Sequence, residues 1–295
     1  MEPKVRRIPW HPAAIFGFAV LAGTILAQQV PPEPAQDRER ELRATYEFEG
    51  WPSGPRRDGI PLPGLTLEGW SAGPLRSDRG RMRRRFDAEG ELRGRAFLVE
   101  AYVADDAGGA HQVLLSWLAG RQHPAPAARG SDRNLDIGDV AFLDVVRTNG
   151  ETAAWIAFAR GNVAVRLTNL DARAHPDLDL STIARRLDGA VAARAALDPG
   201  APLPRPVITG LAARKAEVIA GDVVRVDFRV TDPAGGTPYL EWVVGGPGQG
   251  YVEQHEDGGW YLHTTAAGTI ELALEVTGST GTFARETIEL AVTGN

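Results

Sequence analysis

Two turn signatures within residues 139–168 constrain strand pairing more tightly than any other feature of the sequence. Asn149-Gly150 separates DVAFLDVVR from TAAWIAFA, and Gly161-Asn162 separates that second segment from VAVRLT. Such dipeptides favour two-residue hairpin turns, whose backbone twist matches the twist of the flanking strands. The sequence therefore predicts a three-stranded antiparallel meander in this region.

The positions of the turns also predict the register of the meander. Leu143 stands opposite Ile156, and Ile156 stands opposite Leu167. Phe158 stands opposite Val165 by the same count. One face of the three strands is then consistently apolar, which is the arrangement expected when that face packs against a core.

Two segments beside the meander carry apolar residues at helical spacing. In residues 105–120 the N-cap is Asp105 or Asp106 and Gly120 ends the helix, whereas Asp179 caps the pattern in residues 177–197. We expect both helices to cover the apolar face of the meander. With the strand AFLVEAYV ahead of the first helix, this order predicts an α+β two-layer sandwich made of an antiparallel sheet and two helices.

Proline-rich segments divide the chain. The segment DPGAPLPRP follows the second helix and precedes a strand pattern, which indicates a domain boundary. The charge also changes there, because residues 201–295 contain 6 basic and 12 acidic residues. We expect a Pro-rich linker over residues 28–41, the α+β domain over 42–198, a second linker over 199–205 and a further domain over 206–295.

The chain has no cysteine, which excludes disulfides, thiolate metal sites and a cysteine nucleophile.

The C-terminal domain alternates apolar and polar residues in the manner of β-strands. The inward sets are those of DVVRVDFRV, TIELALEV and the final TIELAV: Val224, Val226, Phe228, Val230, Ile270, Leu272, Leu274, Val276, Ile288, Leu290 and Val292. About seven short strands with Gly-rich turns are typical of a β-sandwich.

Residues 206–293 resemble bacterial immunoglobulin-like domains of the PKD-like kind, in AGDVVRVDFRVTDPAGG, LEWVV, AAGTIELALEVTGSTG and ETIELAV. This resemblance implies an all-β immunoglobulin-like sandwich with Trp242 as the buried tryptophan of its third strand, and a role in spacing, adhesion or presentation of a partner domain.

The N-terminus carries the pattern of an export signal. Lys4, Arg6 and Arg7 precede an uninterrupted run of apolar or small residues over 13–27. This run is shorter than the roughly 20 residues that a membrane-spanning helix needs. We therefore expect residues 1–27 to be a cleaved signal peptide, with an uncleaved anchor as the alternative.

An arginine-rich segment follows in the first domain. We predict that RMRRRFDAEGELRGRAFLV forms a hairpin with a three-residue loop, which places five arginines on one face: Arg81, Arg83, Arg85, Arg93 and Arg95. Such a face is solvated, paired with acidic groups, or occupied by an anion. Because arginine is the default cation of this sequence and the formal net charge is −6, we expect no nucleic-acid binding.

The second candidate surface is the other face of the meander. The register places Trp155 and Phe142 there, and exposed aromatic side chains can form a binding platform. The competing expectation is that residues 38–75, which include Trp51 and Trp70, fold across this face and bury it.

No catalytic, metal or cofactor site is predicted. Ser71 lies in GWSAG, but Pro74 and a strand pattern follow it instead of the helix that a nucleophile elbow requires. His255 and His263 lie near Glu253, Glu256 and Asp257, a mixture able to ligate a divalent metal, yet such residues are commoner as plain surface.

These observations predict an exported bacterial protein that is not an enzyme and acts in binding or structure. It would be periplasmic, envelope-associated or secreted. Its partner would be a protein or an envelope polymer, its immunoglobulin-like domain would be a spacer or docking module, and it would meet the membrane only through an uncleaved N-terminal segment. The alternatives are an envelope hydrolase with a site at the domain junction, and polyanion binding by the arginine hairpin.

Overall fold

The computed structural model describes residues 33–90, 93–121, 125–147, 151–175, 178–215 and 217–294. Residues Glu41–Asn295 form one compact unit. The predicted signal peptide lies outside the described residues. Within them, none of the helices combines the length and the apolarity that a membrane span requires.

The first helix, α1, spans Glu33–Thr45 and replaces most of the predicted Pro-rich linker. Its sequence explains the difference. Pro34 stands in the first turn, where the missing N–H costs nothing, and the rest of the helix is rich in the strong helix formers Ala, Leu, Glu and Arg.

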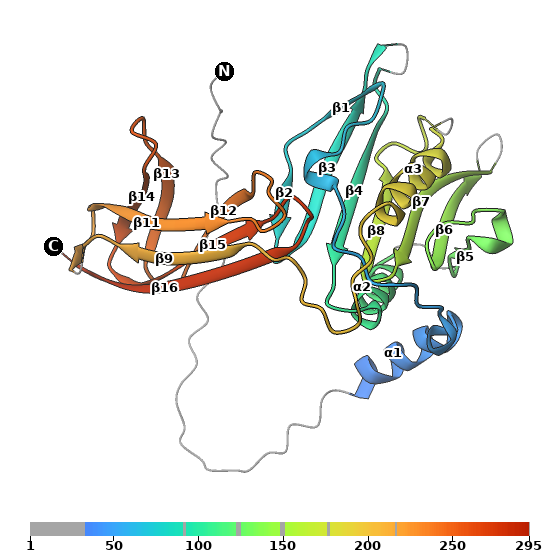
Figure 1. Ribbon diagram of the computed structural model, residues 1–295, viewed down its shortest axis with the longest axis horizontal. Helices are drawn as coiled ribbons and strands as arrows, with labels where there is room; N and C mark the ends of the chain where they lie inside the picture. The colour runs from blue at the N-terminus through green and yellow to red at the C-terminus, as the bar shows by residue number, and fades with distance from the viewer. Residues whose placement is uncertain are drawn as a thin grey trace. The chain divides into compact units, whose positions relative to one another are not determined.

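An eight-stranded sheet dominates the first part of the compact unit, with strand order β1-β3-β4-β8-β7-β6-β5 and β2 paired to β3 (Figure 1). All pairings within it are antiparallel. The strands are β1 (Trp70–Ala72), β2 (Arg76–Asp78), β3 (Arg81–Ala88), β4 (Ala96–Val103), β5 (Ala128–Arg129), β6 (Val140–Arg147), β7 (Glu151–Arg160) and β8 (Val163–Asn169). Short 3-10 helices at Phe48–Gly50, Leu62–Gly64 and Ser131–Arg133 interrupt the connections.

The predicted meander is confirmed as β6, β7 and β8. Leu143 pairs with Ile156, and Ile156 with Leu167. The turn between β7 and β8 is the two residues Gly161 and Asn162, and only the glycine has a positive φ (53°), which is the pattern of a type II′ turn. The other predicted turn, Asn149-Gly150, lies outside the described residues.

Helix α2 (Ala107–Ala119) and helix α3 (Leu180–Ala192) form where the sequence predicts them. The Asp106 side chain accepts the N–H of Gly109, and the Asp179 side chain accepts the N–H of Thr182. Gly120 is the C-cap of α2.

The expectation that both helices cover one face of the sheet is wrong. The buried side chains of α3 join a core with Ile156, Phe158 and Leu167, whereas those of α2 join a separate core with Phe142 and Trp155. The central strands are apolar on both faces, so each face needs its own cover. A two-layer description therefore does not fit, because the sheet has one helix on each side.

The rest of the unit consists of two four-stranded sheets, with orders β10-β16-β15-β12 and β13-β14-β11-β9. The strands are β9 (Val207–Ala213), β10 (Val218–Ile219), β11 (Val223–Thr231), β12 (Tyr239–Gly245), β13 (Gln249–Gln254), β14 (Trp260–Ala266), β15 (Gly268–Thr277) and β16 (Phe283–Thr293). Apolar side chains from both sheets make one hydrophobic cluster. The chain as a whole is mostly β, with three α-helices and several antiparallel sheets among the described residues.

The predicted alternation of these strands is confirmed. All of the residues predicted to face inward lie in the cluster or pack against it. Trp242 is half-buried, and its ring contacts Phe228 edge-to-face at 5.4 Å between centroids.

The β2–β3 hairpin contacts the sheet that contains β12 and β15. Its turn, Arg79-Gly80, has positive φ at both residues, the pattern of a type I′ turn. Backbone N–H groups of the hairpin donate to two carboxylates, from Ser77 to Glu241 at 3.2 Å and from Arg79 to Glu275 at 3.3 Å. These bonds tie the eight-stranded sheet directly to the C-terminal sheets.

A second contact comes from the β15–β16 loop. The N–H of Ile60 donates to the carbonyl oxygen of Thr280 at 2.8 Å. Gly59 has φ +145°, and a Cβ atom at this position would lie 2.0 Å from the same oxygen. Leu203 of the predicted linker 199–205 is also buried, so this segment packs on the first core rather than hanging free.

We predict that Gly59→Ala destabilises the protein by on the order of 3 kcal/mol, because the backbone around Ile60 and Thr280 must separate to admit the methyl group. Gly235→Ala is the matched control, since Gly235 also has a positive φ but a Cβ atom there would meet nothing within 4 Å. The control should lose only the conformational cost of about 1–2 kcal/mol. Equal losses in urea unfolding would show that the contact at Thr280 contributes nothing.

Candidate functional site

The arginine-rich strand β3 alternates between two environments. Arg81, Arg83 and Arg85 lie on one face, whereas Met82 and Phe86 are fully buried on the other. This alternation is the predicted one. We call the surface formed by Arg81, Arg83 and Arg85 of β3 together with Arg166 of β8 the arginine face.

Arg93 and Arg95 do not belong to this face, so the predicted three-residue hairpin loop is wrong. β4 begins at Ala96, and Arg83 pairs with Glu100 rather than with Arg95. The connection between β3 and β4 runs over residues 89–95 and contains Gly90 and Gly94, both with positive φ. The longer connection leaves Arg93 and Arg95 outside the paired strands.

Arg84 has the opposite orientation and a structural role. Its guanidinium donates to the carbonyl oxygens of Leu62, Pro63, Leu65 and Gly73 over 3.0–3.3 Å. Burial lowers the pKa of Arg84 from its usual value. This arginine therefore fastens the 62–73 segment to β3 and is not available to a partner.

The centre of the arginine face is a buried carboxylate. Glu100 of β4 is 1% exposed and stands between Arg83 and Arg166 in adjacent strands. Nε of Arg83 donates to one carboxylate oxygen at 2.8 Å, and Arg166 donates to the other from two nitrogens. One negative charge is thus shared by two guanidinium groups.

The positive charge on this face exceeds the negative charge at its centre. Burial, and then repulsion from Arg81 and Arg83, lowers the pKa of Arg166 to about 10, so the group remains protonated at neutral pH. The Arg83 side chain is 45% exposed. The Arg81 side chain makes no hydrogen bond or ion pair with the residues that the structure describes, although Arg81 pairs with Asp78 across the β2–β3 register. Arg85 forms an exposed ion pair with Asp87.

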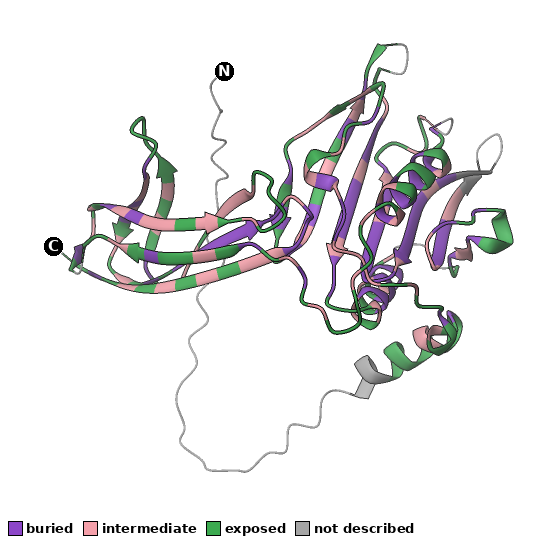
Figure 2. Cartoon of the chain, in the orientation of Figure 1, coloured by how far each residue is buried: buried purple, intermediate pink, exposed green. Residues whose placement is uncertain are grey.

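The arginine face occupies the half of the sheet that α2 leaves uncovered. Beneath α2 the strands carry small residues, Ala157, Ala159 and Ala164, which let the helix approach closely. Figure 2 shows buried residues running along β7 and β8 in this part of the molecule. Arg166 lies at the boundary, with its guanidinium carbon 5.2 Å from the ring centre of Trp117 on α2.

Phe142 and Trp155 are not an exposed platform. Phe142 is fully buried and Trp155 is 9% exposed. Tyr46 and Trp51 pack on Phe142 with ring centroids 5.2 Å away in both cases, and α2 covers the remainder. The competing expectation is therefore the better one, although Trp70 packs against Phe97 on the opposite face.

The serine of GWSAG lies on a strand. Ser71 is in β1 and pairs with Asp87 of β3, so it does not occupy a strand-to-helix elbow. The proposed hydrolase location, the junction, contains two carboxylates, Glu241 and Glu275, on paired positions of β12 and β15. Both accept backbone N–H groups of the β2–β3 hairpin, and Glu275 also pairs with Arg285 at 3.2 Å. These carboxylates hold the junction together.

Both histidines of the C-terminal domain and one of the three acidic residues noted near them converge. Glu253, His255 and His263 bring one ligand atom each to within 4.8 Å of the others. Asp257 is occupied elsewhere, since it accepts the hydroxyl of Tyr261 at 2.8 Å.

No protein-family model, curated protein or solved structure matches this chain. The site therefore rests on its geometry. The sequence patterns did not identify Arg166 or join it to Arg83 through Glu100. The available signal was one charged residue in each of two otherwise apolar strands, AFLVEAYV and VAVRLT.

We predict that Glu100→Gln lowers the free energy of unfolding by about 3 kcal/mol, because it leaves the buried Arg166 charge without its partner. Asp87→Asn is the control on the same face. Its ion pair with Arg85 is exposed and should contribute less than about 1 kcal/mol. Urea unfolding compares the two variants, and a smaller loss for Glu100→Gln than for Asp87→Asn would contradict the assignment.

A pH effect is expected at the junction. Burial, assisted by the neighbouring charge of Glu275, raises the pKa of Glu241. The folded protein then binds this proton more tightly than the unfolded chain does, so the associated stability is present below the ordinary glutamate pKa and is lost as pH rises through the raised value. Glu241→Gln should therefore raise Tm at pH 7 by roughly 1–2 °C, a small value because the group is partly exposed. The gain should vanish at pH 4, and thermal unfolding of Glu241→Gln and the unmodified chain at pH 4 and pH 7 checks it; equal Tm values at pH 7 would contradict the assignment.

Proposed function

We propose that this chain is an exported bacterial binding protein without enzymatic activity. In this proposal the arginine face holds an anionic partner, and an immunoglobulin-like C-terminal domain serves as a spacer or docking module. The first domain is of the α+β class.

Export is supported by the sequence alone. The basic residues Lys4, Arg6 and Arg7 followed by the apolar run over 13–27 are typical of a signal for translocation. A chain without cysteine needs no disulfide chemistry once outside the cytoplasm. The proposed location is the periplasm, the envelope surface or the medium.

The immunoglobulin-like assignment is supported by strand order. An immunoglobulin sandwich places strands A, B, E and D in one sheet and C, F and G in the other. If β9 and β11 are A and B, the orders β13-β14-β11-β9 and β16-β15-β12 correspond to D-E-B-A and G-F-C. The short β10 pairs with β16 in parallel, as a switched continuation of the first strand would.

Binding is supported chiefly by one observation, that two guanidinium groups share a single buried carboxylate with a third guanidinium group nearby. Arg83 and Arg166 share Glu100, while Arg81 lies close enough to repel Arg166 and has no acidic partner among the described residues. A phosphate or carboxylate group can accept several N–H bonds from such a set and relieve the repulsion.

An envelope polymer is the partner that this charge pattern favours. The excess of positive charge is local, because the chain carries a formal net charge of −6. A protein of this kind lacks the broad positive field of a nucleic-acid binder and suits a partner with spaced anionic groups.

The proposal predicts retention on immobilised heparin, a soluble mimic of an anionic polymer, with an affinity that falls as salt rises. Arg81→Glu should weaken heparin binding by about tenfold or more and reduce the slope of log affinity against log salt by about one or more. Arg81 is the chosen position because its side chain makes no hydrogen bond within the described structure, so folding should be preserved.

Arg229→Glu on the exposed side of β11 makes the same change in charge and is the matched control. It should leave heparin retention nearly unchanged. Binding that is absent, insensitive to salt, or reduced equally by both substitutions would overturn the role of the arginine face. Binding of an acidic protein but not of heparin or lipopolysaccharide would replace the polymer with a protein partner.

A further inference from the structure

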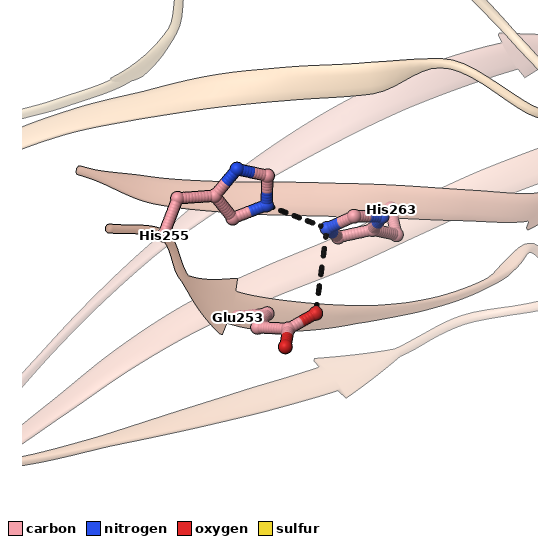
Figure 3. Close-up of side chains that lie close together, drawn as sticks. All are labelled: Glu253, His255 and His263. Atoms are coloured by element: carbon pink, nitrogen blue, oxygen red, sulfur yellow. Dashed lines mark hydrogen bonds and ion pairs between the residues drawn. The ribbon is translucent and has the colours of Figure 1, made fainter. Parts of the chain in front are cut away.

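The β13–β14 hairpin carries a cluster of metal-binding groups on its outer face. Glu253 lies near the end of β13, His255 directly follows that strand, and His263 lies on β14 (Figure 3). Nε2 of His255 is 3.1 Å from Nε2 of His263, and Nε2 of His263 is 3.8 Å from Oε2 of Glu253. The three ligand atoms thus lie close together, and the two imidazoles are linked by a hydrogen bond.

Strand geometry explains why these side chains meet on the solvent side. Tyr251 pairs with His263, and Glu253 pairs with Tyr261, across the hairpin. The intervening residue Leu262 is fully buried and belongs to the sandwich core. Because side chains alternate along a strand, the odd-numbered residues of both strands share the exposed face.

Aromatic rings hold both imidazoles in place. His263 stacks on Tyr251 with 4.7 Å between ring centroids, and His255 stacks on Tyr261 with 4.1 Å. The hydroxyl of Tyr261 donates in turn to Asp257 at 2.8 Å. The rings are therefore oriented by neighbouring side chains, which lowers the entropic cost of gathering them around an ion.

The separations agree with those of ligands on one metal ion. Two nitrogens held about 2.0–2.1 Å from a tetrahedral zinc ion lie roughly 3.3 Å from each other. The nitrogens of His255 and His263 are already 3.1 Å apart. The Glu253 side chain is 50% exposed, so a rotation of its carboxylate toward the histidines meets little resistance.

We propose that Glu253, His255 and His263 bind a late first-row divalent cation such as Zn²⁺. Two imidazoles and one carboxylate are the ligand types of zinc and copper sites, whereas Ca²⁺ and Mg²⁺ require mostly oxygen ligands. The three protein ligands leave a fourth position open to solvent, where water or a group from a partner completes the coordination. Cu²⁺ should bind more tightly than Zn²⁺.

This site is independent of the arginine face, because it lies on a different sheet and uses none of the same residues. A bound ion would join the tip of β13 to β14 and fix the end of the hairpin. It would also give the C-terminal domain a docking point for a histidine or carboxylate of another molecule.

The experiment is a calorimetric titration of the purified, chelator-treated chain with ZnCl2. We expect saturable binding of one ion at this site. His255→Ala and His263→Ala should each weaken it by more than about tenfold, since even loss of an outer-shell partner costs 10–100-fold. Glu253→Gln should weaken it less, because this ligand is exposed and farther from His263.

His175→Ala is the matched control, as it removes a histidine that is not in the cluster, and it should bind zinc as the unmodified chain does. Thermal unfolding with chelator present checks that each variant is folded, which separates loss of a ligand from loss of the hairpin. Cu²⁺ provides a second readout, because nitrogen hyperfine structure from two imidazoles should appear in its electron paramagnetic resonance spectrum and be altered in either histidine variant. No saturable zinc binding, or zinc binding by the His255 and His263 variants equal to that of the unmodified chain, would overturn the proposal.

Discussion

Strand β7 and the part of β8 beneath α2 are apolar on both faces, and this requirement for two covers organises the first part of the molecule. Helix α3 packs on the face that contains Ile156 and Leu167. Helix α2 packs on the other face, over a floor of alanines that allows close approach. The helix is too short to cover that whole face, so the strands beyond it must present groups that tolerate water. The arginine face begins where α2 ends.

The charges on that face follow from the same arrangement. A carboxylate in a central strand is costly to bury unless several donors surround it. Glu100 obtains those donors from the strands on either side, Arg83 of β3 and Arg166 of β8. The cross-strand row thus stabilises the sheet at the edge of the helix and leaves guanidinium groups in excess. The same set of contacts serves folding and, in our proposal, recognition of an anion.

At the junction, backbone hydrogen bonds connect the first part of the chain to the C-terminal part. The β2–β3 hairpin donates backbone N–H groups to Glu241 and Glu275, and the β15–β16 loop accepts a bond from Ile60. Both carboxylates at the junction are engaged by backbone N–H groups. The proposed metal site lies instead on an outer face of the sandwich, where the side chains are not needed to fill the core.

Local rules allowed much of the fold to be predicted. The glycine-containing turn at Gly161-Asn162 set the register of the meander, carboxylates at Asp106 and Asp179 began the helices, and alternation identified the inward residues of the sandwich. Each of these depends on residues close together in the chain, so the sequence by itself determined them. The arginine alternation of β3 belongs to the same class.

Contacts between distant segments were decided only by the tertiary structure. The pattern around Trp155 identified a second apolar face but not its cover, which is made by α2 together with Tyr46 and Trp51. The β3–β4 register was mispredicted because Gly90 alone suggested a tight loop, whereas the pairing of Glu100 with both Arg83 and Arg166 is satisfied only with a longer one. The convergence of His255, His263 and Glu253 depends on the hairpin register and on ring stacking. In each case the deciding term is packing or charge pairing across the fold, which short-range sequence patterns do not encode.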